Sequence, residues 1–147
     1  MQANEKKVRR FSVADGLSLA ADCWGSPDGA PVLFFHGGGQ TRFAWGGTAE
    51  ALAGEGWYAV SFDLRGHGES DWSPDARYFF SAFADDVSVL LQAFDRPVLV
   101  GASLGGIASL IASISTSPHD SGRPKLSNTA RCRSTISDVI MPIASPI

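Results

Sequence analysis

One serine of the chain stands in a setting that could support chemistry. Ser103 lies between Gly101 and Gly105, after a short apolar run and before a helical pattern of apolar residues. The run at residues 98–100 is too short for a helix and is typical of a strand buried on both faces in a parallel sheet. At such a strand-to-helix turn, a serine adopts an unusual backbone conformation that exposes its hydroxyl. The sequence thus predicts a presented hydroxyl beside the free amides and positive dipole end of a helix.

The glycines on either side of Ser103 have a steric explanation. Gly101 and Gly105 lie where strand and helix come closest together, so a side chain at either position would collide with the other element. The motif is short, and a glycine-rich turn with an ordinary serine also explains it. A serine is moreover a poor nucleophile unless a base takes its proton and an acid orients that base. The rest of the chain must therefore support any chemical role.

Apolar patterns elsewhere predict the strands and helices that would position Ser103. Two alternating runs flank the pair Asp15-Gly16, which is a strong hairpin signal. Continuous apolar runs predict further strands, and apolar spacings of three and four predict helices. In chain order we expect strands at 8–13, 17–24 and 31–35, a helix from 43 to 54 or 56, a strand at 58–63 and a helix at 79–94. This alternation predicts an α/β fold: a mostly parallel sheet with flanking helices and an antiparallel amino-terminal hairpin.

Three loops are expected to meet at one edge of this sheet. Ligands of such folds bind beyond the carboxyl ends of the strands. The loops that follow strands at that edge are residues 36–40, residues 63–70 and the turn at Ser103. We therefore expect a functional site where these loops converge.

The motifs in these loops, taken together, resemble those of a known family. They are Phe35-His36-Gly37-Gly38-Gly39, Asp63-Leu64-Arg65-Gly66-His67-Gly68-Glu69-Ser70 and Gly101-Ala102-Ser103-Leu104-Gly105-Gly106. In order and spacing they resemble the amino-terminal half of the α/β-hydrolase fold family. The resemblance covers about residues 11–114 and implies a truncated form of that fold.

The resemblance implies roles for three residues. Ser103 is similar in position to the family's nucleophile, and the backbone amides of Leu104 and Gly38 to the donors of its oxyanion hole. Two such N–H groups stabilise the negative charge of a tetrahedral intermediate. Family members with aspartate at the turn include haloalkane dehalogenases and epoxide hydrolases, whereas serine favours hydrolysis of an ester, a thioester or a carbon–carbon bond through an acyl-enzyme. The implied protein is a serine hydrolase with a small-molecule acyl substrate and no cofactor.

The sequence offers no evident general base. The resemblance places His36 and His67 in structural roles, and it places the family's acid and histidine after the nucleophile. His119 and Asp138 remain as candidates in a segment of Ser, Pro and Arg, and we do not expect them to complete a triad. The acid and the base are therefore expected to be absent, and the chain is expected to be inactive as it stands.

The character of the sequence changes toward its carboxyl-terminal end. All aromatic residues lie at or before Phe94, and the resemblance stops at Ile114. We expect residues 1–114 to form the amino-terminal part of an α/β-hydrolase domain and residues 115–147 to form an irregular tail of low order. A shifted reading frame would produce such a change. The alternatives to a hydrolase are thus a non-functional product of a frameshifted gene and a non-catalytic ligand-binding or interaction protein.

A dinucleotide-binding unit is a further alternative for the first half of the chain. Such a unit also has an apolar strand, a glycine loop and a later strand that ends in an acid, here Asp63. Gly37 and Gly39 fit its glycine spacing, but Arg42 occupies the position of the third glycine. This departure argues against dinucleotide binding.

The composition is that of a soluble globular domain. With 147 residues, of which 44% are hydrophobic and 18% charged, the chain is long enough for one core and not for two. A net charge of −3 gives no electrostatic case for nucleic acid or an anionic membrane as a partner. Cys23 and Cys132 lie far apart, which favours reduced thiols and offers neither a disulfide framework nor a metal site. Because no signal peptide or membrane-spanning run is visible, we expect a cytoplasmic protein.

Overall fold

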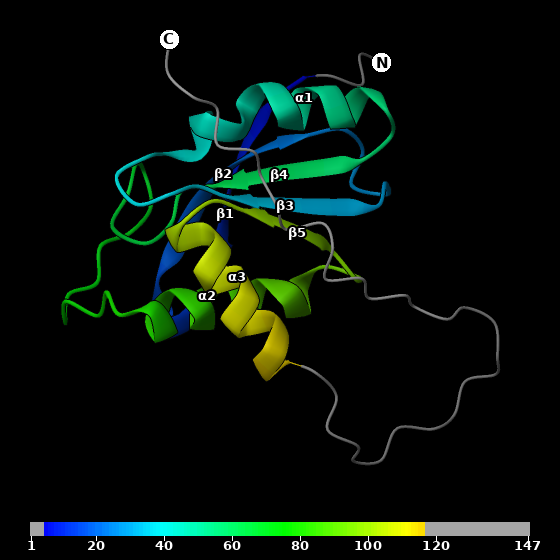
Figure 1. Cartoon of the computed structure of the whole chain (residues 1–147). Coiled ribbons are helices and arrows are strands. Elements are labelled where there is room, and N and C mark those ends of the chain that lie inside the picture. Colours follow the sequence, from blue (N-terminus) through cyan, green and yellow to red (C-terminus); the bar gives the residue numbers. More distant parts are fainter. Residues whose placement is uncertain (1–4, 117–147) are drawn as a thin grey trace, which may run out of the picture.

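A five-stranded mixed sheet forms the centre of the protein in the computed structural model, which describes residues 5–116 (Figure 1). The strands are β1 (Lys7–Ser12), β2 (Ser18–Trp24), β3 (Pro31–Phe35), β4 (Tyr58–Phe62) and β5 (Val98–Gly101), in the spatial order β1-β2-β4-β3-β5. β2 pairs antiparallel with both β1 and β4, whereas β3 runs parallel to both β4 and β5. The carboxyl ends of β3, β4 and β5 therefore share one edge of the sheet.

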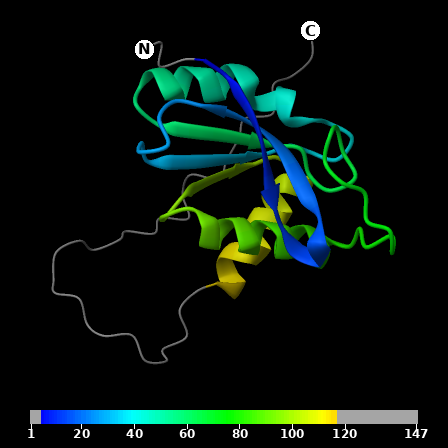
Figure 2. The same cartoon turned by 180° about the vertical axis from the view of Figure 1, so that it is seen from behind.

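Helices cover both faces of this sheet. The α-helices are α1 (Gly46–Gly54), α2 (Phe80–Ala93) and α3 (Leu104–Ser115), and two short 3-10 helices are η1 (Ala14–Gly16) and η2 (Arg42–Trp45). Figures 1 and 2 show α1 on one face of the sheet and α2 and α3 on the other. The helices thus lie as expected for a sheet with parallel strands joined by crossovers.

Each face has its own apolar core. On the α2 and α3 side, strand residues such as Leu33 and Phe62 pack with Val87 and Leu90 of α2. On the α1 side, Phe34 and Val32 pack with the residues of η2 and α1, among them Trp45. β3 and β4 have apolar side chains on both faces for this reason, which is why β3 is a continuous apolar run and β4 is apolar except at Ser61.

The predicted amino-terminal hairpin is present. Asp15 and Gly16, which connect β1 to β2, have φ angles of 58° and 71°. Both values lie in the left-handed region that tight hairpin turns require and that Asp-Gly pairs tolerate. The Val13 N–H donates to the carbonyl of Leu17 at 2.9 Å and closes the turn.

The expectation that residues 98–100 are buried on both faces is wrong. β5 pairs only with β3 within the described residues, so it lies at the edge of the sheet. Val98 is 46% exposed, and Ile107, Leu110 and Ile114 of the adjoining α3 are exposed as well. An apolar pattern indicates a strand but not the number of neighbours that cover it, and this accounts for the error.

The α/β fold class is confirmed over the part of the chain that the structure describes. Every strand and helix expected from the apolar patterns is present there, with bounds within a few residues of those predicted. The predicted tail, residues 115–147, lies outside the described residues from position 117 onward and stays a prediction. Within residues 5–116, no helix combines the length and the apolar character that a membrane crossing needs.

Candidate active site

Ser103 occupies a strained turn at the edge where the parallel strands end. It lies between the end of β5 and the first residue of α3, with φ 47° and ψ −114°, and it is exposed. A non-glycine residue with such a backbone conformation costs about 1–3 kcal/mol, so the surrounding structure must hold it there. Two hydrogen bonds to β3 and its following residue do so: Ala102 N–H to the carbonyl of Phe35 at 3.1 Å, and Gly105 N–H to the carbonyl of His36 at 3.1 Å.

Gly101 and Gly105, the glycines near Ser103, lie where the backbones of neighbouring elements come very close to each other. A Cβ atom on Gly101 would lie 2.6 Å from the carbonyl carbon of Gly105, so this position allows α3 to approach β5. A Cβ atom on Gly105 would lie 2.3 Å from the carbonyl oxygen of Phe35, so this position allows α3 to approach β3. The steric explanation predicted for both glycines is confirmed, with β3 as the element that Gly105 approaches.

The glycine loop after β3 lies directly against this turn. A Cβ atom on Gly37 would lie 3.6 Å from Ser103 Cβ, and one on Gly38 would lie 3.9 Å from Leu104 Cδ2. Both are ordinary van der Waals distances. The structure therefore brings the three predicted site residues, Ser103, Gly38 and Leu104, to one place.

The amides of this loop differ in their partners. Gly37 N–H donates to Gln40 Oε1 at 2.9 Å, and Gly39 N–H donates to His67 Nε2 at 3.1 Å. Between them, the N–H of Gly38 has no hydrogen-bond partner among residues 5–116, and Gly38 is exposed. The N–H of Leu104 is likewise unpaired within that range, because it belongs to the first turn of α3. Two unpaired amides thus belong to Gly38 and Leu104, residues that lie close to each other at the Ser103 turn.

Both described histidines have their ring nitrogens engaged by the backbone. His36 is fully buried; its Nε2 accepts the Leu64 N–H at 3.0 Å, and its Nδ1 donates to the carbonyl of Gly37 at 2.7 Å. His67 Nε2 accepts the Gly39 N–H, and its Nδ1 donates to the carbonyl of Arg65 at 3.0 Å. A ring nitrogen that accepts an amide hydrogen carries no proton, so each ring is neutral with a fixed tautomer. Neither has a nitrogen free to take a proton from Ser103.

Acidification is expected to destabilise the protein through His36. Burial lowers the pKa of His36 below its ordinary value of 6.5, and this outweighs the hydrogen bond to Gly37, which raises it. Between the two pKa values the unfolded chain binds a proton that the folded chain does not, so stability falls as the pH drops below about 6.5. Urea unfolding between about pH 7.5 and about pH 5 measures this slope. A His36→Gln variant should have a shallower slope, and a wild-type unfolding free energy that rises on acidification would contradict the assignment.

A buried charge cluster ties the loops after β3 and β4 together. The Arg42 guanidinium, 3% exposed, donates to Asp22 at 2.9 Å and also pairs with Asp63 and Glu69. Asp63 is fully buried and accepts the backbone N–H groups of Arg42 and Glu69. A dinucleotide-binding unit needs this acid at the surface to reach a ribose, so the structure argues further against that alternative.

A second buried ion pair was not predicted from the sequence. Arg65 is fully buried and donates to both carboxylate oxygens of Asp86 at 2.6 Å. Asp86 lies on the apolar face of α2, beside the buried residues Phe83 and Val87. An acid among apolar residues at helical spacing is the signal that could have revealed this pair.

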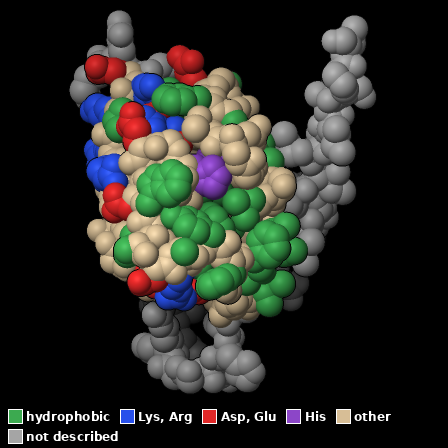
Figure 3. Space-filling model, turned by 90° about the vertical axis from the view of Figure 1, so that its left-hand side faces the viewer, with side chains coloured by type: hydrophobic (Ala, Val, Ile, Leu, Met, Phe, Trp, Pro, Cys, Tyr) green, Lys and Arg blue, Asp and Glu red, His purple; other side chains and the backbone are tan. Residues whose placement is uncertain are grey.

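The surface around the site is partly apolar. Figure 3 shows hydrophobic side chains close to a histidine side chain on one face of the molecule. Trp72, Phe79 and Phe80 are more than half exposed, in the segment that leads into α2. Trp45, in contrast, is buried and packs on Phe34 with ring centroids 5.6 Å apart.

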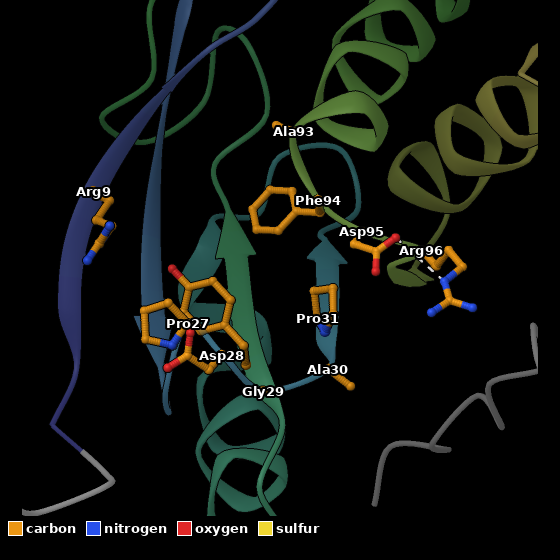
Figure 4. Close-up of a pocket in the computed structure, with 11 residues that line it drawn as sticks. Arg9, Pro27, Asp28, Gly29, Ala30, Pro31, Ala93, Phe94, Asp95 and Arg96 are labelled. Atoms are coloured by element: carbon orange, nitrogen blue, oxygen red, sulfur yellow. Dashed lines mark ion pairs between the residues drawn. The ribbon is translucent and has the colours of Figure 1, made fainter.

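A separate hollow lies at the opposite end of the parallel strands (Figure 4). Its volume is about 720 Å³, and its lining includes the first residues of β3 and β4, Pro31 and Tyr58. Burial raises the pKa of the Tyr58 hydroxyl to about 12, so this group is a weak acid. None of the described residues that line the hollow is a serine, cysteine or histidine, so this lining offers no rival to Ser103 for nucleophilic chemistry.

Comparisons with known proteins agree with the fold. Residues 32–144 match the model of the "Alpha/beta hydrolase family". A non-heme chloroperoxidase of Streptomyces lividans is 33% identical over 97 residues, which are 65% of this chain and 35% of that protein. An esterase of Mycobacterium tuberculosis is 34% identical over 96 residues, 63% of this chain and 30% of the esterase. The chain thus spans about a third of the length of the curated relatives it matches.

Among solved structures, an alpha/beta hydrolase from Novosphingobium aromaticivorans has a similar fold. Its TM-score is 0.68 at 28% identity, and the match covers 76% of this chain and 40% of that one. The likeness supports the α/β fold, and the chain spans less than half of that protein.

Proposed function

Because the chain belongs to the alpha/beta hydrolase family, we propose that Ser103 is the nucleophile of an acyl-transfer site whose oxyanion donors are the N–H groups of Gly38 and Leu104. The substrate class is a small-molecule carboxylic ester, thioester or activated carbon–carbon bond. Serine, rather than aspartate, at the turn supports an acyl-enzyme as the intermediate. The esterase among the relatives supports the ester as the first substrate to test.

The observation that carries this proposal is the pattern of free amides. Of three consecutive glycine amides, the two outer ones are bonded to side chains, and only that of Gly38 is free. Gly38 lies against Leu104, whose N–H is also free, and the neighbouring Ser103 is exposed. Donors fixed in advance in this way stabilise a developing oxyanion, and each typically contributes about 10²–10³ in rate.

The proposed reaction follows from these positions. Ser103 Oγ attacks the carbonyl carbon, and the carbonyl oxygen, now negatively charged, accepts hydrogen bonds from Gly38 and Leu104. Collapse of this intermediate expels the leaving group and leaves an acyl-serine, which water then hydrolyses to the free acid and the serine.

In the proposed reaction the Ser103 proton passes to solvent water and the leaving group takes a proton from water, because residues 5–116 supply no histidine with a free ring nitrogen. His36 and His67 have both ring nitrogens engaged. The sequence candidates His119 and Asp138 lie outside the described residues. We therefore expect the full chain to form a covalent adduct with a reactive probe but to turn over an ester slowly, since an oxyanion site alone retains about 10³–10⁴ of rate enhancement over water.

Labelling of the full chain with a fluorophosphonate tests the proposal, with the adduct counted by intact-mass spectrometry and located by peptide mapping. We expect slow formation of one adduct in the wild-type chain, located on Ser103, because no described base assists the attack, and no adduct in Ser103→Ala. Ser81→Ala, which removes an exposed serine at the start of α2, is the matched control and should label as the wild type does. Absence of an adduct in the wild type, or an adduct that persists in Ser103→Ala, would overturn the assignment and favour a non-catalytic protein.

A Gly38→Ala variant tests the oxyanion loop separately from the nucleophile. The added Cβ would make an ordinary contact at 3.9 Å with Leu104 Cδ2, so we expect the fold to tolerate it. The methyl group would, however, hinder approach to the Gly38 N–H. The labelling rate should fall by about tenfold to a hundredfold, which reaches the lower end of the range for complete loss of one donor, at an unchanged melting temperature. An unchanged rate would exclude the Gly38 amide from the site.

A further inference from the structure

We propose that His67 is a positioning residue for this site: with His36, it holds the glycine loop from two sides so that the Gly38 N–H is the amide left free beside Ser103. This inference rests on the proposed function, and it adds a role for a residue that has no part in the chemical steps. Its basis is the set of hydrogen bonds on either side of Gly38.

The first set of hydrogen bonds fixes the peptide group that carries the Gly38 N–H. That N–H and the carbonyl of Gly37 belong to one planar trans peptide, so they point in opposite directions. The Gly37 carbonyl accepts from His36 Nδ1 at 2.7 Å and from the Gln40 N–H at 3.1 Å. Because the carbonyl is fixed toward the buried His36 ring, the Gly38 N–H is turned away from it, to the exposed side of the loop.

The second constraint is a hydrogen bond of the following residue, Gly39. Gly39 has φ +78°, in the region that favours glycine, and its N–H donates to His67 Nε2 at 3.1 Å. Three consecutive glycines form the least restricted backbone that a chain can have, so bonds must supply the order that side chains would otherwise give. His67 fixes the end of the loop that His36 does not reach.

His67 is itself held by groups that belong to the core. Its Nδ1 donates to the carbonyl of Arg65, whose guanidinium is paired with Asp86 of α2. Its ring lies 4.9 Å from that of His36 and 6.5 Å from that of Phe83, measured between centroids. A continuous series of contacts therefore runs from α2 to the Gly39 amide, and His67 is its last member.

Amide hydrogen exchange of the ¹⁵N-labelled full chain tests the role of His67 directly in the wild type. We expect the Gly39 amide to be protected and the Gly38 amide to exchange at the rate of an unbonded group. Equal protection of the two amides, or protection of Gly38 alone, would overturn the proposal whether or not the protein has any activity.

Two variants extend this test to the reactivity of Ser103. His67→Leu removes the acceptor, whereas in His67→Gln the Oε1 atom can replace Nε2 as an acceptor. We expect His67→Leu to lose Gly39 protection and to label with fluorophosphonate about tenfold to a hundredfold more slowly, as for partial loss of one oxyanion donor, and His67→Gln to recover both. Unchanged Gly39 exchange in His67→Leu, or a failure of His67→Gln to recover it, would contradict the positioning role.

These measurements separate the two proposals. If the wild-type chain does not label, the proposed function fails, while exchange at Gly39 still decides whether His67 holds the loop. If the wild type labels on Ser103 and Gly39 is unprotected, the proposed function stands and the positioning role is wrong. Should His67→Leu not fold, the wild-type exchange and the His67→Gln variant still decide the matter.

Discussion

Replacing Arg65 with methionine is expected to lower the free energy of unfolding by about 3–5 kcal/mol, a large part of the stability of a domain of this size. Methionine fills much of the space of the arginine stem but leaves the Asp86 carboxylate buried without its partner. That carboxylate is 1% exposed and now accepts two hydrogen bonds of 2.6 Å from Arg65. The loss is therefore that of an uncompensated buried charge, and urea unfolding at neutral pH measures it.

A double variant distinguishes this explanation from a simple loss of packing. In Arg65→Met with Asp86→Leu, both charges are replaced by apolar groups, and we expect most of the lost stability to return. Arg96→Met is the matched surface control, because the Asp95–Arg96 pair is 3.5 Å long and both side chains are at least 80% exposed. Its effect should stay within about 0.5 kcal/mol. A double variant no more stable than Arg65→Met would show that the buried charge is not the cause.

Gly105→Ala is expected to cost about 3 kcal/mol or more, at the upper end of the range for overpacking. The new Cβ would lie 2.3 Å from the carbonyl oxygen of Phe35 and 2.6 Å from that of His36, and these backbone atoms cannot rotate away. The start of α3 would have to move from β3, which would carry the Leu104 N–H away from Gly38. Both the unfolding free energy and the rate of fluorophosphonate labelling should therefore fall.

Gly47→Ala is the control for Gly105→Ala. Gly47 lies in α1, is exposed, and a Cβ atom there would meet nothing within 4 Å. Alanine has a higher helix propensity than glycine, so this change should leave labelling unchanged and stabilise the protein by up to about 1 kcal/mol. If Gly105→Ala and Gly47→Ala were equally stable, α3 could shift at Gly105 without cost. The short distance between Gly105 and the Phe35 carbonyl would then not be needed for stability.

Local patterns in the sequence were sufficient to predict the elements of the fold. The apolar runs identify β3 and β4, and the Asp15-Gly16 pair identifies the hairpin, because strand periodicity and turn conformation depend on neighbouring residues. Gly101 and Gly105 could be explained in advance for a similar reason, since a strand, a sharp turn and a helix in succession bring fixed positions together. The exposure of β5 follows from its place at the edge of the sheet, which its own apolar run does not specify.

Local sequence patterns could not predict the contacts that stabilise the site. The partners Arg65 and Asp86 are 21 positions apart in the chain, and the Gly39 amide and His67 are 28 positions apart. Nothing in the sequence near either partner specifies the other; the pairing follows from the order β4-β3-β5 and from the packing of α2 against the sheet. For the same reason, the sequence suggested that His67 is structural but not which amide it binds.

In the proposed site, a tetrahedral oxyanion formed at Ser103 accepts hydrogen bonds from the amides of Gly38 and Leu104. A crystal structure of the fluorophosphonate adduct of the full chain tests this arrangement. We expect phosphorus bound to Ser103 Oγ and a phosphoryl oxygen about 2.7–3.1 Å from the nitrogens of both Gly38 and Leu104. A phosphoryl oxygen directed into solvent, or an adduct on any other residue, would contradict it.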